Sequence, residues 1–130
     1  NQMKNLEIKS KSNDGFSLNI AINYGGRDEI IRATKKIVKH VINKKLKVSE
    51  IDSHSFSNYL DTSGQKDPDL IIRTAGERRL SNFLLWQISY SELYFSDEMW
   101  PDFSKQSLKN AIDWYTARER KFGNLKQIAN

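Results

Sequence analysis

The chain has 130 residues, of which 38% are hydrophobic, and it carries 21 Lys and Arg against 16 Asp and Glu, a formal net charge of +5. We expect residues 1–130 to form one globular unit with a modest core; the absence of cysteine excludes disulfides, and no apolar run is long enough for a transmembrane helix. The positive charge suits an anionic substrate, an anionic membrane surface or nucleic acid, and composition does not choose among them.

The first half of the chain predicts one strand and two helices after a polar lead-in. A turn at Gly25-Gly26 follows the strand, and glycines in such a turn favour a positive φ. The lysines of the first helix are expected on its solvated outer face. The predicted bounds are 18–23 for the strand, about 28–45 for the first helix and 49–60 for the second.

The second half predicts two strands and two helices. Asp69–Thr74 is a short apolar run behind the Asp67-Pro68 turn, typical of a core strand with Arg73 at its C-terminal end. Ser81–Tyr90 is apolar on nearly every face, typical of a buried helix, and Ser81 is its expected N-cap. A strand is expected over 92–95 and a helix over about 104–121, whose inward stripe would be Leu108, Ile112, Tyr115 and Phe122.

Strands that alternate with helices indicate a mostly parallel sheet with helices on both faces, an α/β fold. Ligands of such sheets lie beyond the carboxyl ends of the strands. The sequence places Arg73, Arg78 and Arg79 there, together with Ser81. Guanidinium groups bind phosphate oxygens in pairs, so the cluster suits a diphosphate. The alternative is that Arg78 and Arg79 are solvated loop charges and that Arg73 pairs with a carboxylate.

Glu92 is the carboxylate of most interest, because it stands between the expected buried helix and the aromatic strand Leu93-Tyr94-Phe95. A glutamate is rarely buried without a partner. That partner could be an arginine such as Arg73 or Arg79. It could also be Mg²⁺, which proteins hold through one or two carboxylates plus substrate phosphates. The residues alone leave both alternatives open.

Three segments together resemble the cis-prenyltransferase family, and within it most closely the bacterial enzymes that make undecaprenyl diphosphate. The segments are LNIAINYGGRDEI from Leu18, RTAGERRLSNFLLWQISYSELYFSDEMWPDF from Arg73 and RERKFG from Arg118. They occur in the order of the family and span nearly the whole chain. The family's N-terminal motif, His-x-x-Met-Asp-Gly-Asn-Gly-Arg-Trp, has no counterpart here. The chain is therefore expected to be the C-terminal part of a cis-prenyltransferase domain.

The resemblance implies an activity, the condensation of isopentenyl diphosphate onto an allylic prenyl diphosphate with cis geometry. By position, Arg73, Arg79 and Ser81 match the family's isopentenyl diphosphate ligands, with Arg78 in a supporting role. Glu92 matches the glutamate that takes part in binding Mg²⁺ and diphosphate. Gly123 matches a glycine that approaches the diphosphate of the partner subunit, and the implied assembly is a homodimer.

Two positions depart from the family pattern. Ala75 replaces the first glycine of Arg-Thr-Gly-Gly-Glu, which costs roughly 1 kcal/mol if the position requires φ > 0 and nothing otherwise. Lys121 replaces the arginine of the closing Arg-x-Gly, so the positive charge is kept but the planar guanidinium that can bind two oxygens at once is lost. The contribution of Lys121 and Gly123 to a partner's site is therefore in doubt.

Three functions follow from these observations. The first is the isopentenyl diphosphate-binding, dimer-forming half of a synthase, with the catalytic aspartate and phosphate loop supplied by a separate N-terminal half. The second is a non-catalytic partner subunit or an inactive fragment. The third is a basic nucleic-acid-binding domain, which no recognised base-reading motif supports, so no nucleic acid is expected. The expected location is cytoplasmic, with peripheral contact to the inner face of the membrane.

Overall fold

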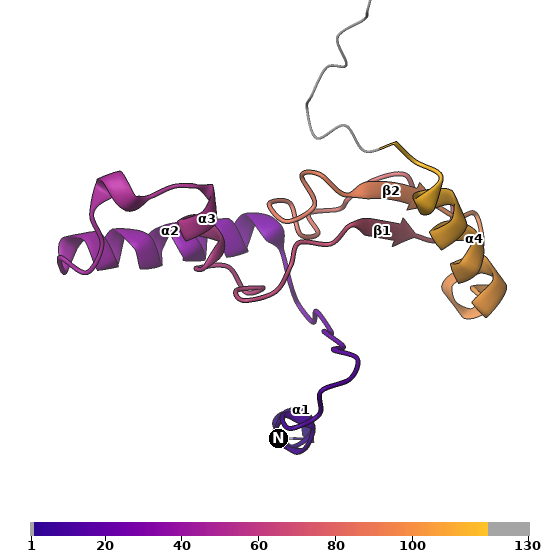
Figure 1. The fold of residues 1–130 in the computed structure, drawn as a ribbon, viewed down its shortest axis with the longest axis horizontal. Helices are drawn as coiled ribbons and strands as arrows, with labels where there is room; N and C mark the ends of the chain where they lie inside the picture. The colour runs from indigo at the N-terminus through magenta and orange to yellow at the C-terminus, as the bar shows by residue number, and fades with distance from the viewer. Residues whose placement is uncertain (1, 120–130) are drawn as a thin grey trace, which may run out of the picture.

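The computed structural model describes residues 2–119. The elements, in chain order, are α1 (Gln2–Ser10), α2 (Gly26–Ile42), a 3-10 turn (Val48–Glu50), α3 (Ser53–Ser57), β1 (Leu70–Arg73), β2 (Glu92–Phe95), a second 3-10 turn (Trp100–Asp102) and α4 (Lys105–Thr116). They form an elongated molecule in which α2 and α3 lie at one end, the strands lie in the middle and α4 lies beyond them (Figure 1). Helix α1 stands apart at the end of a connecting segment.

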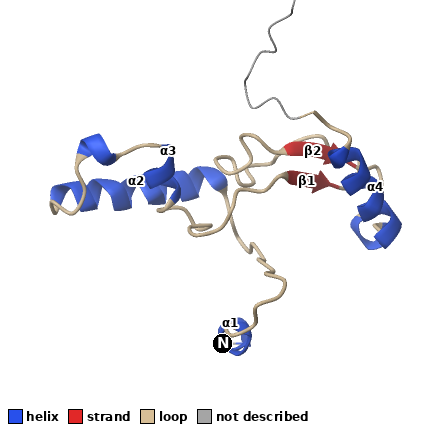
Figure 2. Ribbon diagram, in the orientation of Figure 1, coloured by secondary structure: helices blue, strands red, loops and turns tan. Residues whose placement is uncertain are grey.

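Strands β1 and β2 form a parallel sheet (Figure 2). The register pairs Leu70 with Glu92 and Arg73 with Phe95. Parallel neighbours require a long crossover, and residues 74–91 provide it. The two strands predicted in the second half of the chain are therefore confirmed, and with them the α/β class.

The strand predicted over 18–23 is wrong for the part of the chain that the structure describes, which assigns no strand there. A strand is held by hydrogen bonds to a neighbour, and no other described segment pairs with these residues. The polar lead-in before them contains α1, none of whose residues is buried.

The helix predicted over Ser81–Tyr90 is also wrong, because the segment is a series of turns. Ser81, Asn82 and Leu84 have φ values of 47°, 64° and 44°, in the left-handed region. A right-handed helix cannot pass through such residues, and an N-cap residue lies in the β region instead. Ser81 is therefore not a helix cap, and it begins no helix dipole site.

The two helices predicted in the first half are present with different bounds. The basic helix is α2, which ends near Lys44 with its φ of 55°. The second helix is reduced to α3 and the 3-10 turn before it. The buried positions of α2 include Glu29, Ala33 and Ile37, which are spaced four residues apart and share one face.

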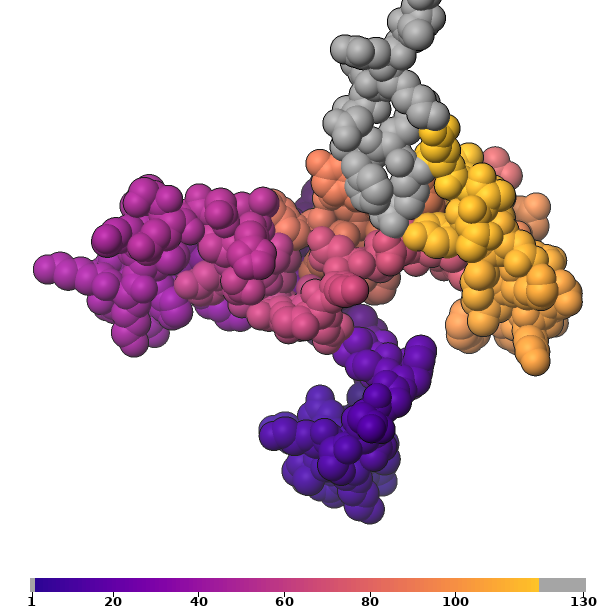
Figure 3. Space-filling model, in the orientation of Figure 1, coloured from indigo at the N-terminus to yellow at the C-terminus, as the bar shows by residue number. Residues whose placement is uncertain are grey.

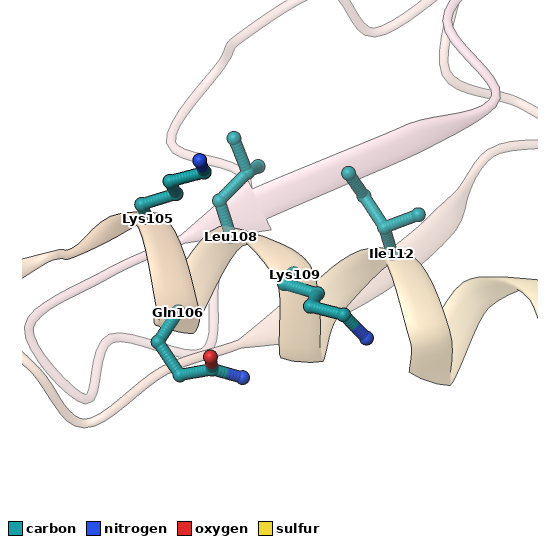
Figure 4. Close-up of a pocket in the computed structure, with 5 residues that line it drawn as sticks. All are labelled: Lys105, Gln106, Leu108, Lys109 and Ile112. Atoms are coloured by element: carbon teal, nitrogen blue, oxygen red, sulfur yellow. The ribbon is translucent and has the colours of Figure 1, made fainter.

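Helix α4 packs on β2 through Trp114, whose ring lies 5.3 Å from that of Tyr94. Its buried positions are Ser107 and Ala111, so the predicted inward stripe is wrong at its start. Leu108 and Ile112 are 43% and 45% exposed, and both project from one side of the helix into an open hollow (Figure 4). Tyr115 is half-buried. Phe122 lies outside the described residues.

The apolar core within residues 2–119 is small. No helix in this range is both long and apolar enough to cross a membrane. The buried hydrophobic side chains there are Ala33, Ile37, Leu60, Ile88 and Ala111.

Candidate functional site

Asn82 joins two of the three segments that carry the family resemblance, those that begin at Leu18 and at Arg73. Its main-chain carbonyl accepts a hydrogen bond from the Gly26 N–H at 2.7 Å, and its side-chain Oδ1 accepts one from the Arg27 N–H at 2.9 Å. The first N–H groups of a helix have no partner within the helix, so Asn82 satisfies two donors of α2. The Asn-Tyr-Gly-Gly-Arg turn and the arginine loop are thereby fixed against each other.

The two glycines at the start of α2, Gly25 and Gly26, permit this approach. A Cβ on Gly26 would lie 3.0 Å from Cγ of Leu85, and a Cβ on Gly25 would lie 2.9 Å from Nδ2 of Asn82. The expectation of a positive φ at these glycines is wrong, because the left-handed residue is Asn23, with φ 52°. The glycines serve close packing of two backbones instead.

Glu29 is a buried carboxylate with several donors. It is 1% exposed, and it accepts hydrogen bonds from the Tyr24 hydroxyl at 2.5 Å and the Asp61 N–H at 2.7 Å. The Gln87 amide Nε2 lies 3.1 and 3.2 Å from its two oxygens. Burial and the hydrogen bond to Glu29 raise the pKa of Tyr24 above its usual value. Glu29 thus ties α2 to the loop after α3 and to the segment that precedes β2.

A second ionic contact reinforces the same junction. Arg32 binds both carboxylate oxygens of Asp61, at 2.8 and 2.6 Å, and also pairs with Asp28 at 2.7 Å. The guanidinium lowers the pKa of the Asp61 carboxyl. Because Arg32 binds both oxygens of Asp61, the pairing fixes the orientation of the loop after α3 relative to α2 as well as its distance from the helix.

Arg73 and Arg79 line one cavity of about 210 Å³. Arg73 ends β1, as predicted, and its side chain has no hydrogen-bond or ion-pair partner among residues 2–119. Arg79 forms an ion pair with Glu77 and keeps 62% of its side chain exposed. The other lining residues are apolar: Leu70, Ile71, Ile72, Leu80, Phe83, Ile88 and Phe95. The cavity thus combines two guanidinium groups with a hydrocarbon wall.

Arg78 and Ser81 lie near this cavity in sequence but do not line it. Both are exposed, and Ser81 carries a left-handed backbone. Gly123 and Lys121 lie outside the described residues. The structure therefore brings together two of the predicted anion-binding residues and leaves Arg78 and Ser81 at the surface.

Ala75, which stands where the family pattern has glycine, is in the left-handed region with φ 65°. The backbone at this position is therefore strained by the alanine side chain. Its N–H donates to the Glu98 carbonyl at 2.7 Å, and the N–H of Gly76 donates to the Ser96 carbonyl at 2.9 Å. These bonds hold the loop that follows Arg73 against the end of β2.

Glu92 pairs with an arginine that neither alternative names. Nε of Arg118 lies 3.1 Å from its Oε2, and the Arg118 guanidinium stands 5.1 Å from the centre of the Trp114 ring. The register places Glu92 opposite Leu70, at the far end of the short sheet from Arg73. No group of three or more acidic, His or Cys side chains gathers as a metal site within residues 2–119. Glu92 could supply one carboxylate to a cation whose other ligands come from elsewhere.

Sequence reasoning missed Asn82, Glu29 and Gln87. A signal existed for Glu29, since its spacing from Ala33 and Ile37 places it on the buried face of α2. Nothing local distinguished Asn82, because its role depends on a partner 55 residues away. Gln87 was missed because the sequence predicts a helix over residues 81–90, whereas the structure has turns there.

The chain is an α/β protein in which Arg73 and Arg79 line one cavity. A family model described as "Putative undecaprenyl diphosphate synthase" matches residues 1–123. The chain therefore belongs to the undecaprenyl diphosphate synthase family of cis-prenyltransferases.

Relatives and solved structures agree with this assignment. An isoprenyl transferase of Aquifex aeolicus is 50% identical over 96% of this chain and 52% of its own length. A ditrans,polycis-undecaprenyl-diphosphate synthase of Buchnera aphidicola is also 50% identical, over 96% of this chain and 50% of its own. A lavandulyl diphosphate synthase from Lavandula x intermedia, solved with dimethylallyl diphosphate, matches with a TM-score of 0.90 and 41% identity over 93% of this chain and 52% of its own.

A probable undecaprenyl diphosphate synthase from Campylobacter jejuni matches with a TM-score of 0.80 and 43% identity, over 95% of this chain and 55% of its own. The chain thus spans about half the length of the relatives and structures that it matches. What the whole length does in those proteins comes to this chain only as a proposal.

Proposed function

We propose that this chain supplies the isopentenyl diphosphate site of a cis-prenyltransferase, as the C-terminal part of that enzyme's domain. The reaction condenses isopentenyl diphosphate onto an allylic prenyl diphosphate with cis geometry. The observation that carries the proposal is the cavity shared by Arg73 and Arg79. Membership of the family supports it, because members are named as synthases of prenyl diphosphates.

The chemistry of the cavity matches a ligand with two unlike ends. Arg73 and Arg79 would bind the diphosphate through charge-assisted hydrogen bonds, and Arg79 would exchange its pairing with Glu77 for phosphate oxygens. Phe83 and Phe95 would contact the short isopentenyl chain and exclude water from it. Ser81 would add a hydroxyl donor at the rim, with Arg78 as a more distant positive charge.

We assign Mg²⁺ as the cofactor and Glu92 as one of its ligands. Mg²⁺ keeps most of its ligands from water and phosphate, so a lone carboxylate is compatible with it. When bound, the ion would neutralise charge on a leaving diphosphate. Arg118 holds Oε2 of Glu92 at 3.1 Å, and would have to release that oxygen when the carboxylate binds the ion.

Isopentenyl diphosphate binding measured by calorimetry in Mg²⁺ buffer tests the site. Arg73→Ala and Arg79→Ala should each weaken binding by roughly tenfold to a hundredfold, since hydrogen bonds to charged groups contribute about 1.5–3 kcal/mol. Arg78→Ala is the matched control, because it removes the neighbouring charge without touching the cavity. Equal losses in Arg78→Ala and Arg79→Ala would show general charge attraction and overturn the site.

The second candidate is a non-catalytic partner subunit or an inactive fragment of such a synthase, in which the cavity of Arg73 and Arg79 would bind its ligand without a reaction. We expect this chain alone to elongate no allylic diphosphate, because its candidate groups hold one substrate only. Incubation with radiolabelled isopentenyl diphosphate and an allylic diphosphate measures this. Elongation above the level of an Arg73→Ala sample would contradict it.

We further propose that two copies of the chain associate through β2 and the turn after it. Met99 and Trp100 are 58% and 73% exposed there, and β2 pairs with β1 on one edge. Unpaired strand edges invite pairing with another chain. Sedimentation at low concentration tests this, and a folded monomer would contradict it.

A further inference from the structure

Helix α2 has a second apolar stripe on the side opposite to its buried one. Ile31 is 53% exposed, Val38 50% and Ile42 74%. These positions are seven and four residues apart, so they lie along one side of the helix, whereas the buried Ala33 and Ile37 lie on the other. A helix side that only faces water carries polar residues at such positions. The stripe therefore indicates a contact beyond the packing of α2 on the described chain.

The same part of the chain is strongly basic. Residues 30–49 contain seven Lys and Arg and no Asp or Glu, whereas the net charge of the whole chain is +5, so the rest of the chain has a net negative charge. Arg32 pairs with Asp28 and Asp61. The six lysines of this range are exposed and enter no ion pair among residues 2–119: Lys35, Lys36, Lys39, Lys44, Lys45 and Lys47.

Two of these lysines border the apolar stripe. Lys35 is four residues after Ile31 and Lys39 is three residues before Ile42, and residues at these spacings are neighbours on a helix surface. The hydrocarbon stem of a lysine lies along apolar surface while its ammonium group reaches outward. The outer side of α2 thus combines an aliphatic centre with positively charged margins.

This side of α2 belongs to one end of the molecule. The helix runs from the middle of the molecule to that end (Figure 1). Figure 3 shows the segment from α2 to α3 as one end of the elongated molecule, away from α1 and α4. A broad surface can therefore approach this end without meeting either of those helices.

Anionic lipid fits this combination better than nucleic acid or protein does. Aliphatic side chains insert at the boundary of the acyl chains, and lysine ammonium groups bind lipid phosphates. Nucleic acid would leave the aliphatic stripe in water, because it is bound by cations and stacked aromatic rings, and α2 contains no Phe, Tyr or Trp. Protein interfaces are depleted in lysine, which here borders the stripe.

We infer that the outer side of α2 docks on the surface of a bilayer that contains anionic lipid. Ile31, Val38 and Ile42 insert between the head groups, and Lys35 and Lys39 bind the phosphates beside them. The helix lies in the plane of the interface, and Lys44, Lys45 and Lys47 follow at its end. The arginine cavity contains no residue of α2, so the inference does not rest on the proposed function.

Sedimentation with lipid vesicles at physiological ionic strength tests the charged margin. The full 130-residue chain should bind vesicles of equal parts phosphatidylcholine and phosphatidylglycerol, and should bind pure phosphatidylcholine roughly tenfold more weakly or less. Lys35→Glu with Lys39→Glu should weaken binding to the anionic vesicles by roughly tenfold or more. Lys105→Glu with Lys109→Glu makes the same change of charge on α4 and should leave most of the binding.

The same assay tests the aliphatic stripe. Val38→Gln with Ile42→Gln removes two exposed apolar side chains and should weaken binding to the anionic vesicles by roughly tenfold. Leu108→Gln with Ile112→Gln is the matched control, since these side chains are 43% and 45% exposed on α4, and it should bind as the unmodified chain does. Circular dichroism checks that both pairs keep their helices.

A single thiol reports insertion directly, because the chain has no cysteine of its own. Val38→Cys carries an environment-sensitive dye coupled through maleimide, and its emission should shift to the blue when anionic vesicles are added. Ile112→Cys, labelled in the same way on α4, should show no shift. This measurement leaves Ile31 and Ile42 in place, so it stands even where the glutamine pair alters the helix.

Four outcomes overturn the inference. The first is no binding of the unmodified chain to anionic vesicles. The second is equal loss in the two charge-reversed pairs, which would show general attraction of a basic molecule. The third is no blue shift at the Val38→Cys dye, which would show charge contact without insertion. The fourth is tighter binding of single-stranded DNA than of anionic vesicles, which would assign the lysines to nucleic acid.

Failure here is distinguishable from failure of the proposed function. Val38→Gln with Ile42→Gln should bind isopentenyl diphosphate as the unmodified chain does, because neither residue lines the arginine cavity. Vesicle binding without binding of isopentenyl diphosphate would keep this inference and remove that function. Binding of isopentenyl diphosphate without vesicle binding would do the reverse.

Discussion

Asn82 and Gly26 are joined by a main-chain hydrogen bond of 2.7 Å at the start of helix α2. The Asn82 side chain reaches the next N–H of the helix, that of Arg27, at 2.9 Å. One residue thus closes the N-terminus of α2 from outside the helix, where Gly25, the local cap residue, offers no side chain. The same residue sits three positions after Arg79, so the cap and the cavity share a short segment.

Asn82→Ala should destabilise the chain by about 1–2 kcal/mol. The substitution removes the bond to the Arg27 N–H, and it places alanine at φ 64°, a left-handed conformation that asparagine tolerates better. Asn82→Gly should cost less, because it loses the cap and relieves the backbone. Urea unfolding of both variants, with Asn110→Ala as an exposed control, measures the difference. Equal midpoints for Asn82→Ala and the unmodified chain would exclude the cap.

The strands in the second half of the chain and the α/β class could be predicted from sequence, because short apolar runs bounded by turn residues are local signals. Arg73 could be placed at the end of its strand for the same reason. The turns of residues 81–90 could not be predicted, since the left-handed Asn82 is held by hydrogen bonds to α2, a contact between distant segments that the local pattern does not contain. The apolar content of residues 81–90 predicts a buried helix, but the structure has turns there, which depend on contacts with distant parts of the chain.

The candidate site could also be predicted only in part. Charge and position indicate Arg73 and Arg79, and the structure brings both to one cavity. For Glu92 the sequence predicts either an arginine partner, such as Arg73 or Arg79, or a metal. The structure gives it an arginine, but this is Arg118, which follows α4 and which no local spacing connects to β2. The roles proposed for all the site residues remain predictions: Arg73, Arg78, Arg79, Ser81, Glu92 and Gly123.

Glu29→Ala should destabilise the chain by about 3 kcal/mol or more. It leaves the Tyr24 hydroxyl and the Asp61 N–H without their acceptor, and it leaves Gln87 Nε2 with Thr62 Oγ1 as its one remaining acceptor. Unsatisfied buried donors cost about 1–3 kcal/mol each. Glu29→Gln should cost less, because its amide oxygen still accepts one bond and Oε1 of Gln87, buried without a partner, can receive another.

Urea unfolding measures both Glu29 variants, and Asp28→Ala is the matched control. Asp28 precedes Glu29 in the first turn, but its side chain is 72% exposed. The control should shift stability by less than about 1 kcal/mol. A Glu29→Ala chain as stable as this control would show that the carboxylate is not a structural junction.

Ala75→Gly should stabilise the chain by roughly 1 kcal/mol. Ala75 has φ 65°, a conformation that costs a residue with Cβ about 1–2 kcal/mol, part of which glycine returns through its greater freedom when unfolded. Thermal unfolding measures the gain. Ala117→Gly, at the right-handed C-cap of α4, is the control and should not stabilise. A lower melting temperature for Ala75→Gly would mean that the methyl group makes a contact worth more than the strain.

Tyr24→Phe should remove part of the loss of stability at high pH. Burial, followed by the hydrogen bond to Glu29, raises the pKa of Tyr24 above its usual value. Above about pH 10 the unfolded chain therefore loses the phenolic proton while the folded chain keeps it, so stability falls as pH rises through this window and is unaffected below it. One tyrosine in such a state costs about 1.4 kcal/mol for each pH unit.

Urea unfolding of the Tyr24→Phe chain at about pH 9 and about pH 11 measures this dependence. At the lower pH the variant should be less stable by about 1 kcal/mol, because the hydrogen bond to Glu29 is gone. Between the two pH values it should lose about 1 kcal/mol less than the unmodified chain. Tyr90→Phe is the control, since Tyr90 is 70% exposed, and it should keep the full pH dependence. The same slope in both variants would mean that Tyr24 ionises as freely in the folded chain as in the unfolded one.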